Sequence, residues 1–408
     1  MDSGDLRGGA LSSLDNRGVR GTNQSGMRDS NERLVLSLVR RHSALSKTDI
    51  ARMTGLSAQT VSVIMRKLEE DGLLKRGEPI RGRIGQPSVP MSLEPEGAYF
   101  LGLKIGRRSA ELVLIDFVGR LQAICRLSYR YPSPDDTVEF VTEAMAAIRS
   151  GLTAAQDGRI AGLGIAIPFE LWNWADTAGT PRGVMEQWRH RDIRADIQAR
   201  CGFPVYLQND ATAACGAELV FGRGAELRDF VYFYIGAFAG GGIVLNGGLY
   251  SGASGNAGAL GSMPVPGPGG AAIQLIDVAS IAILEKGLNA TGVEAPHLWT
   301  SPEDWGDLGP ELDGWIERSG AALAYATVAA CSVIDFEAAV IDGWMPASIR
   351  ARLVAATQAA IAGIDVEGIG VPSIREGSVG HNARAIGAAS LPLSDRFLLG
   401  AGQSAKAV

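Results

Sequence analysis

The sequence predicts an α/β protein in which a winged helix-turn-helix domain precedes a two-lobed α/β domain. Residues 31–87 contain three helix patterns followed by a short hairpin pattern, an arrangement typical of winged helices. From about residue 97, strand patterns alternate with helix patterns. The alternation runs twice, and each run opens on strands joined by short turns. Two similar lobes with a ligand cleft between them are therefore expected.

Chain length and composition narrow the class of protein. At 408 residues the chain has room for two or three domains. No apolar run reaches about 18 residues, so we expect no membrane partner. The four cysteines are scattered without a metal-ligand spacing, which predicts reduced thiols in a cytoplasmic protein. The expected division is a disordered tail at 1–25, a winged helix-turn-helix domain at 26–92 and a large domain at 93–408, with lobe 1 at about 97–208 plus 385–408 and lobe 2 at about 209–384.

The first two helices of the small domain have recognisable apolar and capping residues. The apolar face of the first helix is expected to consist of four residues: Leu34, Leu36, Leu38 and Val39. Ser46 and Asp49 have the spacing of a capping box at the start of the second helix. Gly55 is expected to end that helix.

The third helix has the pattern of a DNA recognition helix. Val61, Ile64 and Leu68 recur at helical spacing and predict a buried face. The opposite face is polar near its start and cationic one turn later, which suits contact with base edges and then phosphates. The residues expected to contact DNA are Ser57, Gln59, Thr60, Ser62, Arg66 and Lys67 on this helix, and Arg81, Arg83 and Gln86 on the wing.

The charge distribution favours DNA as the partner of the small domain. The first 92 residues hold 15 Lys and Arg against 10 Asp and Glu, whereas the whole chain has a net charge of −6. A positive head on an acidic body is typical of a DNA-binding domain attached to a sensor or assembly domain. A small helical protein-interaction module is the alternative interpretation of the same pattern.

The elements of the large domain follow in order from the same patterns. The first run is expected to contain strands at 98–105, 109–117, 120–129, 162–168 and 204–210, and helices at 138–152 and 211–222. The second run is expected to contain a strand with a following glycine loop at 229–242, strands at 243–250, 337–343 and 372–377, and helices at 274–288, 314–334, 347–361 and 382–391.

From about residue 21 to residue 391, these segments together resemble transcriptional regulators of the ROK family (repressors, open reading frames, sugar kinases). The resemblance rests on the winged helix, LGLKIGRRSAELVLIDFVGRL, GIAIP, VYLQNDATAACGAEL, the glycine-rich run around YIGAFAGGGIVL, and GHNARAIGAASLPL. It implies the two-lobed actin-like ATPase/sugar-kinase fold, with a sugar cleft between the lobes. Regulators of this family bind operator DNA as dimers or tetramers.

Departures from the kinase motifs predict that the chain is not an enzyme. Where family kinases have D-x-G-G-T, this sequence reads Lys104 to Arg108, with an acid replaced by a cation. In the second phosphate loop Phe238 replaces a small residue. Asp210 matches the kinase general base, but phosphoryl transfer also needs the phosphate loops. We therefore expect no kinase activity and no cofactor, and Asp210 is expected to accept a hydrogen bond from a ligand hydroxyl.

The zinc motif of the family is also missing. The position of its histidine ligand holds Ser262, and no cysteine lies between Cys215 and Cys331. Because such a site needs imidazole and thiolate ligands, we expect no bound metal. Ala259 replaces a glutamate that contacts the sugar in the family.

Several polar and aromatic residues remain as candidates for binding a sugar. Carboxylates, amides and indole rings suit a ligand with hydroxyl groups and apolar faces. The candidates are Asn209, Asp210, Asn256, Glu170, Trp172, Asn173 and Trp188. The tryptophans can instead be core or subunit-interface residues, and Asn209 with Asp210 can cap a helix. Lys104, Arg107 and Arg108 can bind an anionic ligand such as a sugar phosphate, or form a solvated or ion-paired turn.

These observations predict a DNA-binding regulator, expected to be a repressor, of carbohydrate uptake or utilisation genes. Its expected partners are operator DNA, a sugar or sugar derivative, and further copies of itself in a homodimer or homotetramer. Two alternatives stay open. The large domain can serve only for oligomerisation, or the chain can be an active sugar kinase with a DNA-binding head.

Overall fold

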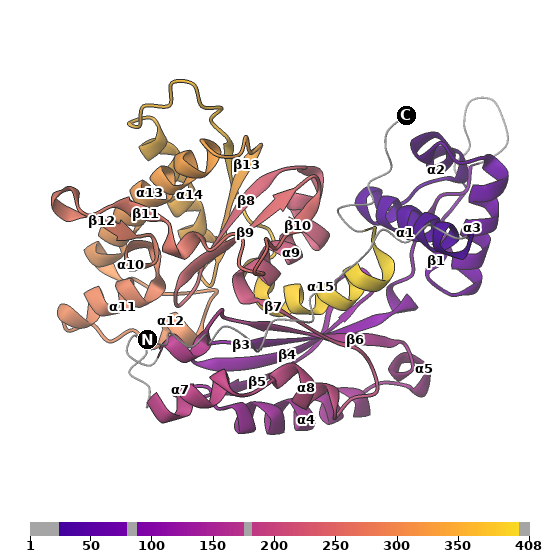
Figure 1. The fold of residues 1–408 in the computed structure, drawn as a ribbon, viewed down its shortest axis with the longest axis horizontal. Helices are drawn as coiled ribbons and strands as arrows, with labels where there is room; N and C mark the ends of the chain where they lie inside the picture. Colours follow the sequence, from indigo (N-terminus) through magenta and orange to yellow (C-terminus); the bar gives the residue numbers. More distant parts are fainter. Residues whose placement is uncertain (1–23, 80–87, 175–181, 400–408) are drawn as a thin grey trace, which may run out of the picture.

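The computed structural model describes residues 24–79, 88–174 and 182–399. Figure 1 shows the small N-terminal domain at one end of a larger body that consists of two lobes. Each lobe is built on a sheet, and helix α15 (Ala383–Phe397) lies between the two lobes and points toward the small domain. Helix α15 therefore contacts Asp210 near its start and the core of the small domain at its end.

The small domain consists of three helices and a short hairpin. Its elements are α1 (Gln24–His42), α2 (Lys47–Thr54), α3 (Ala58–Glu70), β1 (Leu74–Arg76) and β2 (Met91–Leu93). The predicted caps are confirmed. Ser46 and Asp49 form a reciprocal capping box on α2, and that helix ends at Gly55. Ser57 caps α3 by accepting a hydrogen bond from the Thr60 amide at 3.1 Å.

The first helix differs from the prediction in two ways. It begins at Gln24, so its first two residues belong to the segment expected to be a disordered tail. The fully buried positions of its apolar face are Val35, Leu36 and Val39, whereas Leu34 and Leu38 are only half-buried. The predicted face was therefore rotated, because this helix packs both on α3 and on the large domain.

Lobe 1 is a five-stranded sheet in the order β5-β4-β3-β6-β7. Its strands are β3 (Tyr99–Ile105), β4 (Ser109–Asp116), β5 (Leu121–Ser128), β6 (Ile160–Ile167) and β7 (Val205–Asn209). The first three strands are antiparallel, and β6 and β7 are parallel to β3. Its flanking helices are α4 (Pro134–Ser150), α5 (Ala154–Asp157), α7 (Arg182–Arg189) and α8 (Ile193–Gln198).

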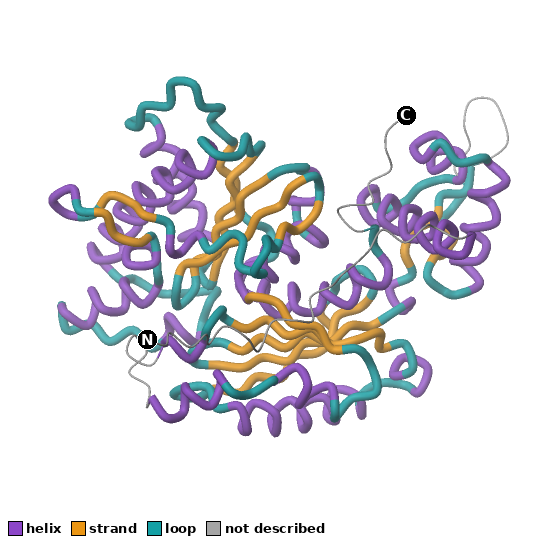
Figure 2. The backbone as a smooth tube through the Cα atoms, in the orientation of Figure 1, coloured by secondary structure: helices purple, strands orange, loops and turns teal. Residues whose placement is uncertain are grey.

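Lobe 2 repeats this topology with the order β10-β9-β8-β13-β14. Its strands are β8 (Phe230–Ile235), β9 (Ala239–Leu245), β10 (Gly248–Tyr250), β13 (Ala338–Gly343) and β14 (Ser373–Glu376). Its main helices are α9 (Asp210–Phe221), α11 (Ile281–Ala290), α13 (Gly309–Cys331) and α14 (Ala347–Ile361). The sheet is packed between α9 and the α13–α14 side (Figure 2).

Two element predictions in lobe 2 were wrong. The glycines expected in a loop, Gly240 to Gly242, lie inside β9 and pair with β8. Glycine is needed there because a Cβ at Gly242 would lie 2.5 Å from Cys215 Cβ on α9. The helix expected at 274–288 is two helices, α10 (Ile276–Ala279) and α11, which meet at Ser280. The Ser280 hydroxyl accepts a hydrogen bond from the Ala239 amide at 2.9 Å and ties this break to the sheet.

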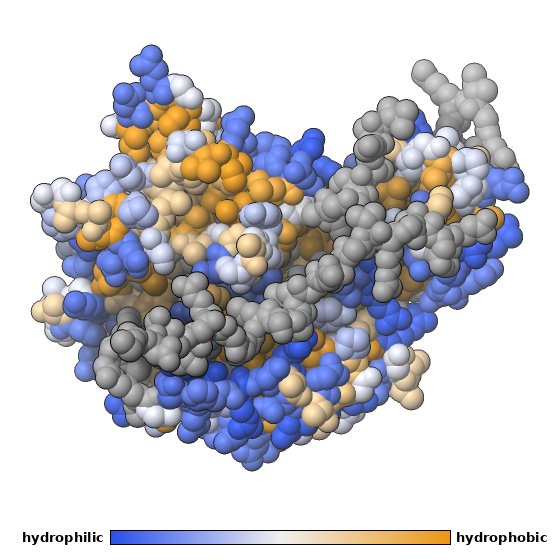
Figure 3. Space-filling model, viewed as in Figure 1, coloured by the Kyte–Doolittle hydropathy of each residue, from blue (hydrophilic) through white to orange (hydrophobic). Residues whose placement is uncertain are grey.

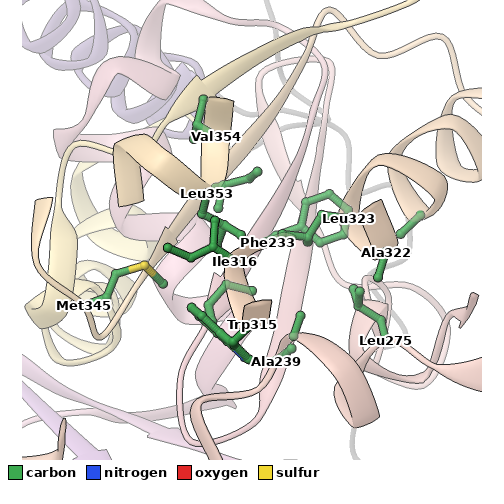
Figure 4. Packing of buried hydrophobic residues seen from close by; sticks show 14 of the residues in the cluster. Phe233, Ala239, Leu275, Trp315, Ile316, Ala322, Leu323, Met345, Leu353 and Val354 are labelled. Atoms are coloured by element: carbon green, nitrogen blue, oxygen red, sulfur yellow. The ribbon is translucent and has the colours of Figure 1, made fainter. Parts of the chain in front are cut away.

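The core of lobe 2 is dense and aromatic. Figure 4 shows Phe233, Trp315 and Leu323 among the packed side chains. Trp315 is fully buried, and its indole N–H donates to the Ser280 carbonyl at 3.2 Å. This core holds rigid the wall of the cleft that lobe 2 provides.

Helix α15 lies unusually close to both lobes. A Cβ at Gly164 of β6 would lie 1.8 Å from the Ala388 carbonyl oxygen of this helix, and a Cβ at Gly387 of this helix would lie 1.9 Å from the Ala213 carbonyl oxygen of α9. Glycine at these two positions lets backbone pack on backbone. The other end of the helix joins the core of the small domain through Leu393 and Phe397.

The outer surface is mostly polar, as expected for faces that pack on no other part of the chain. Figure 3 shows mostly hydrophilic residues over the outer faces of the small domain and of lobe 1. Among the described helices, none is both long enough and apolar enough to cross a membrane.

Candidate functional site

The polar face of α3 is open to solvent. Gln59, Thr60 and Arg66 are exposed, and Ser62 is half-buried. The opposite face is anchored by Val61, Ile64, Met65 and Leu68, which are all buried. Ser57 is exposed but engaged in the helix cap, where its hydroxyl also lies 2.8 Å from Thr60 Oγ1. The helix therefore presents short polar groups at its start and an unpaired cation, Arg66, one turn later among the described residues.

Lys67 differs from Arg66 because it has an acidic partner within the domain. Its Nζ lies 2.8 Å from Glu32 Oε1 of α1, and this hydrogen bond raises the pKa of Lys67. A phosphate would have to compete with Glu32 for this cation. The three candidates on the wing, Arg81, Arg83 and Gln86, lie outside the described residues.

Two cleft candidates lie where β7 meets α9. Asn209 caps α9, because its Oδ1 accepts from the amides of Ala211 and Thr212 at 3.1 Å each. Asp210 Oδ2 accepts from Arg384 Nη1 at 3.2 Å. The capping interpretation of Asn209 is thus what the contacts show, and its amide nitrogen stays available for a ligand.

Asn256 lies in the loop that follows β10. It is half-buried, and the described residues provide no hydrogen-bond partner for its side chain. Gln208, beside Asn209, donates to Ser251 Oγ in the same loop at 3.4 Å. The loop that contains Asn256 is therefore connected to the strand end that leads to Asp210.

The tryptophan-rich segment after β6 does not provide one continuous ligand wall. Trp188 is 4 % exposed, packs in the core of lobe 1, and donates from its indole N–H to the Pro132 carbonyl at 3.0 Å. The prediction that Trp188 contacts the ligand was therefore wrong, since helical spacing turned it toward α4. Glu170 is exposed and Trp172 is half-buried against the same core, while Asn173 belongs to a 3-10 turn (Leu171–Trp174).

Lys104 is buried rather than solvated. Its side chain is 5 % exposed, and its Nζ donates to Ser109 Oγ at 2.7 Å and to Glu111 Oε1 at 3.1 Å. Burial lowers the pKa of Lys104 to about 8, with Glu111 opposing this shift and Arg384 adding to it. Arg108 lies 3.4 Å from Glu285 of lobe 2. Of the two interpretations of this turn, the ion-paired one describes these contacts.

The cleft is bridged by cations of one lobe and aromatic rings of the other. Arg108 lies 5.1 Å from the ring centroid of Trp299, and Lys104 lies 5.8 Å from that of Trp344. Arg384, at the start of α15, lies 5.0 Å from the ring centroid of Tyr234. The prediction missed Arg384, Trp299 and Trp344. These residues are far apart in the sequence and come together only in the tertiary fold. The only sequence signal was that Arg384 belongs to the terminal GHNAR run.

A second contact joins the small domain to lobe 1. Arg40 of α1 donates from Nη2 to the Phe117 carbonyl, and its guanidinium lies 5.3 Å from the Phe117 ring centroid and 5.5 Å from that of Phe221. Burial lowers the pKa of Arg40 to about 10, and Asp116 partly opposes this. The ring of Phe397 packs edge-on against Phe117 at 5.0 Å, so the end of α15 belongs to the same junction.

The prediction of no bound metal rests on the missing histidine and cysteine ligands of the family's zinc motif. Within residues 24–79, 88–174 and 182–399, no group of three or more His, Cys, Asp and Glu side chains is placed to hold a metal ion. Ser262 ends a single 3-10 turn, Leu260–Ser262. The expectation of no bound metal stays a prediction.

Two family models match the chain. Residues 28–75 match the winged helix-turn-helix DNA-binding family, and residues 100–274 match the ROK family. The chain carries a ROK family domain behind a winged helix-turn-helix domain. Lys104, Asn209 and Asp210 lie inside the residues that match the ROK family, whereas Trp299, Trp344 and Arg384 follow them in the chain.

Relatives of similar organisation include repressors. A protein of Sinorhizobium fredii, y4fQ, is 26% identical over 390 residues, which is 91% of this chain and 92% of the relative. The xylose repressor of Bacillus spizizenii is 26% identical over 235 residues, which is 58% of this chain and 60% of the repressor. The match to that repressor thus covers less than two thirds of its length.

Solved structures share the fold. A ROK family transcriptional regulator, a homologue of the Escherichia coli MLC protein, is similar with a TM-score of 0.64 at 20% identity, over 91% of this chain and 98% of that one. A ROK family glucokinase from Streptomyces griseus, solved with glucose and AMPPNP, is similar with a TM-score of 0.56 at 20% identity, over 72% of this chain and 99% of the kinase. The ROK fold thus occurs both in regulators and in sugar kinases.

Proposed function

We propose that this protein is a transcriptional repressor of sugar-utilisation genes, that it binds operator DNA through α3 and the wing, and that a sugar or sugar derivative in the interlobe cleft controls it. The observation that carries the proposal is the exposed recognition helix of a small domain that shares a hydrophobic core with the large domain behind it. The repressors among its relatives support the same function. Such a protein acts on chromosomal DNA and therefore in the cytoplasm.

The proposed DNA contacts are the residues of α3 and the three wing residues named from the sequence. Arg66 has no acidic partner among the described residues and is the best placed cation for a phosphate. Gln59 and Ser62 are placed for base edges. The proposal treats the protein as a homodimer or homotetramer, because operator sites of this kind have two half-sites.

The proposed sugar site lies around Asn209 and Asp210, and Asn256, Glu170, Trp172 and Asn173 stay candidates for it. Asp210 would accept a ligand hydroxyl in place of, or beside, its bond to Arg384. Since Arg384 begins α15 and Phe397 ends it against Phe117, a change at Asp210 has a direct structural route to the small domain.

We further propose that the ROK domain has no kinase activity. Buried Lys104 stands where family kinases have the acid that helps to hold the metal, and Phe238 stands in the second phosphate loop, with Arg107 5.6 Å from its ring centroid. Phosphoryl transfer depends on positioned metal and backbone amides at these loops, so Asp210 alone would not suffice.

Two assays test the proposal on the full chain. Fluorescence anisotropy with DNA from upstream of its own gene, against an excess of random competitor DNA, should show specific binding that one sugar of a panel changes. A coupled assay of ADP release with the same sugars should show no turnover. Equal affinity for upstream and random DNA would rule out the repressor, and turnover that Asp210→Asn abolishes would rule out the inactive ROK domain.

A further inference from the structure

A pocket of about 540 Å³ opens between the lobes, and Arg384 is among the residues that line it. Such a volume is in the range of small-molecule sites. The floor of the pocket is Lys104 of β3, and its rim includes Arg107 and Arg108 of the following turn. Arg384 separates this pocket from Asp210, which it contacts at 3.2 Å.

The pocket is strongly cationic. Five cations line it, and only two carboxylates, Glu285 and Glu294, share the lining; the five are Lys104, Arg107, Arg108, Arg126 and Arg384. Glu111 lies beneath and is shared, at 3.1 Å from Lys104 Nζ and 3.4 Å from Arg126 Nε. Three carboxylates, Glu111, Glu285 and Asp210, pair with four of the five cations, so positive charge exceeds negative charge around the pocket and favours an anionic ligand.

Two of the cations have unused hydrogen-bonding capacity. Arg107 has no carboxylate within 4.0 Å among the described residues, and its guanidinium lies 5.6 Å from the Phe238 ring centroid. The Nε of Arg384 is buried without a partner in the described part of the chain. A buried donor without an acceptor costs roughly 1–3 kcal/mol, and a ligand oxygen would recover it.

The lobe 2 wall of the pocket is aromatic. Trp299 is held by its N–H bond to Glu285 at 2.6 Å, and Trp344 by its N–H bond to the Leu298 carbonyl at 2.9 Å. Both rings are thus fixed, with cations of lobe 1 over their faces. Trp344 is buried beneath these cations, whereas half-buried Trp299 can offer an apolar surface to the C–H groups of a ligand that carries hydroxyl groups.

We propose that this pocket binds a small polyol through its anionic group, phosphate or carboxylate, and that Arg384 is shared between this pocket and the site at Asp210. The anion lies among Lys104, Arg107 and Arg384, and the carbon skeleton lies against Trp299. This inference rests on the proposed control by a sugar derivative and specifies its charge. Neutral sugars lack the group that the cations require and bind more weakly.

The test is isothermal titration of the full chain with glucose 6-phosphate, gluconate, glucose and inorganic phosphate at low and high salt. We expect an anionic polyol to bind at least about ten-fold more tightly than glucose, with an affinity that falls as salt rises. The phosphate and carboxylate arms show which anion is preferred. Equal binding of glucose, or binding of inorganic phosphate as tight as that of both anionic polyols, would overturn the inference.

Variants locate the site. Arg107→Gln should weaken the anionic polyol at least about ten-fold. Arg120→Gln, at the opposite end of β4, is the matched control and should bind normally. Thermal unfolding without ligand shows whether each variant is folded, and Arg108→Gln serves if Arg107→Gln is not. Binding unchanged in the folded variants, or no binding of any probe to the wild type, would overturn the inference. Operator binding measured on the same preparations separates this failure from failure of the proposed repressor.

Discussion

Arg384 and Asp210 form an ion pair, 3.2 Å from Nη1 to Oδ2, that fastens the start of α15 to the start of α9. Both side chains are largely buried, at 13% and 15% exposure. Arg384 also lies over Tyr234 of lobe 2 and lines the cationic pocket. One side chain therefore connects Asp210, lobe 2 and this pocket.

Removing Asp210 should destabilise the ROK domain. Asp210→Ala leaves the buried Arg384 without its carboxylate, and breaking such a pair costs about 3 kcal/mol. Asp210→Asn keeps an acceptor and should cost less. Urea unfolding followed by circular dichroism measures both, and equal stabilities of wild type and Asp210→Ala would show that this pair does not hold the helices together.

The junction between the domains should depend on Arg40. Arg40→Ala removes the hydrogen bond to the Phe117 carbonyl and the contacts with two rings, a loss of roughly 1.5–3 kcal/mol for a charged donor. We expect faster hydrogen exchange in α1 and a small domain that melts separately. The neighbouring Arg41→Ala is the control, because Arg41 is exposed. An unchanged exchange rate in α1 would contradict the role of Arg40.

The recognition face should divide into base contacts and phosphate contacts. Gln59→Ala and Ser62→Ala should change operator preference, each by about 1–3 kcal/mol between bases. Arg66→Ala should instead weaken all DNA similarly and lower the salt slope by about one. Titrations at several salt concentrations distinguish these effects, and a loss of preference in Arg66→Ala alone would mean that the assignments are reversed.

The pair of Lys67 and Glu32 should restrain DNA binding. Glu32→Gln frees the ammonium group for a phosphate and should increase affinity for random DNA, with a steeper salt slope. Lys67→Ala should weaken binding only slightly, because in the wild type this cation is shared with Glu32. If Glu32→Gln leaves the affinity unchanged while the domain stays folded, Lys67 does not face DNA.

Lys104 should make stability depend on alkaline pH. Between pH 8 and about 10.5 the unfolded chain keeps a proton that the folded chain has released, so the contribution of Lys104 to stability rises with pH, by up to about 3 kcal/mol. The groups facing it are Glu111, Arg126, Arg384 and Asp210. Denaturant unfolding of wild type and Lys104→Met across this range gives the difference. A constant difference would show that Lys104 does not titrate there.

Local signals in the sequence predicted local structure well. Ser46 with Asp49, and Gly55 after them, placed the limits of α2, because capping depends on neighbouring residues. The same reasoning failed for Gly240 to Gly242, since a glycine run in a strand is explained only by the helix packed on it. Trp188 failed for a related reason. Its type suggested a ligand wall, but its direction is set by contacts with Pro132 and the core of lobe 1.

The cleft was predictable in part. Asn209 and Asp210 stood out because they follow a strand and begin a helix. Arg384 and Trp344 lie far along the chain, and no spacing connects them to Asp210. Folding alone brings these residues together, and it forms in the same way the cationic pocket that they help to line.

The glycine contacts of α15 limit how the lobes can move. Backbone packs on backbone at Gly164 and at Gly387, so sliding of the helix along either lobe would break these close contacts. A rotation of the lobes about the long axis of α15 would keep both contacts. Phe397 lies at the end of α15 that faces the small domain, where it packs against Phe117 beside Arg40. Such a rotation would therefore change the angle at which the recognition helix α3 enters the DNA groove.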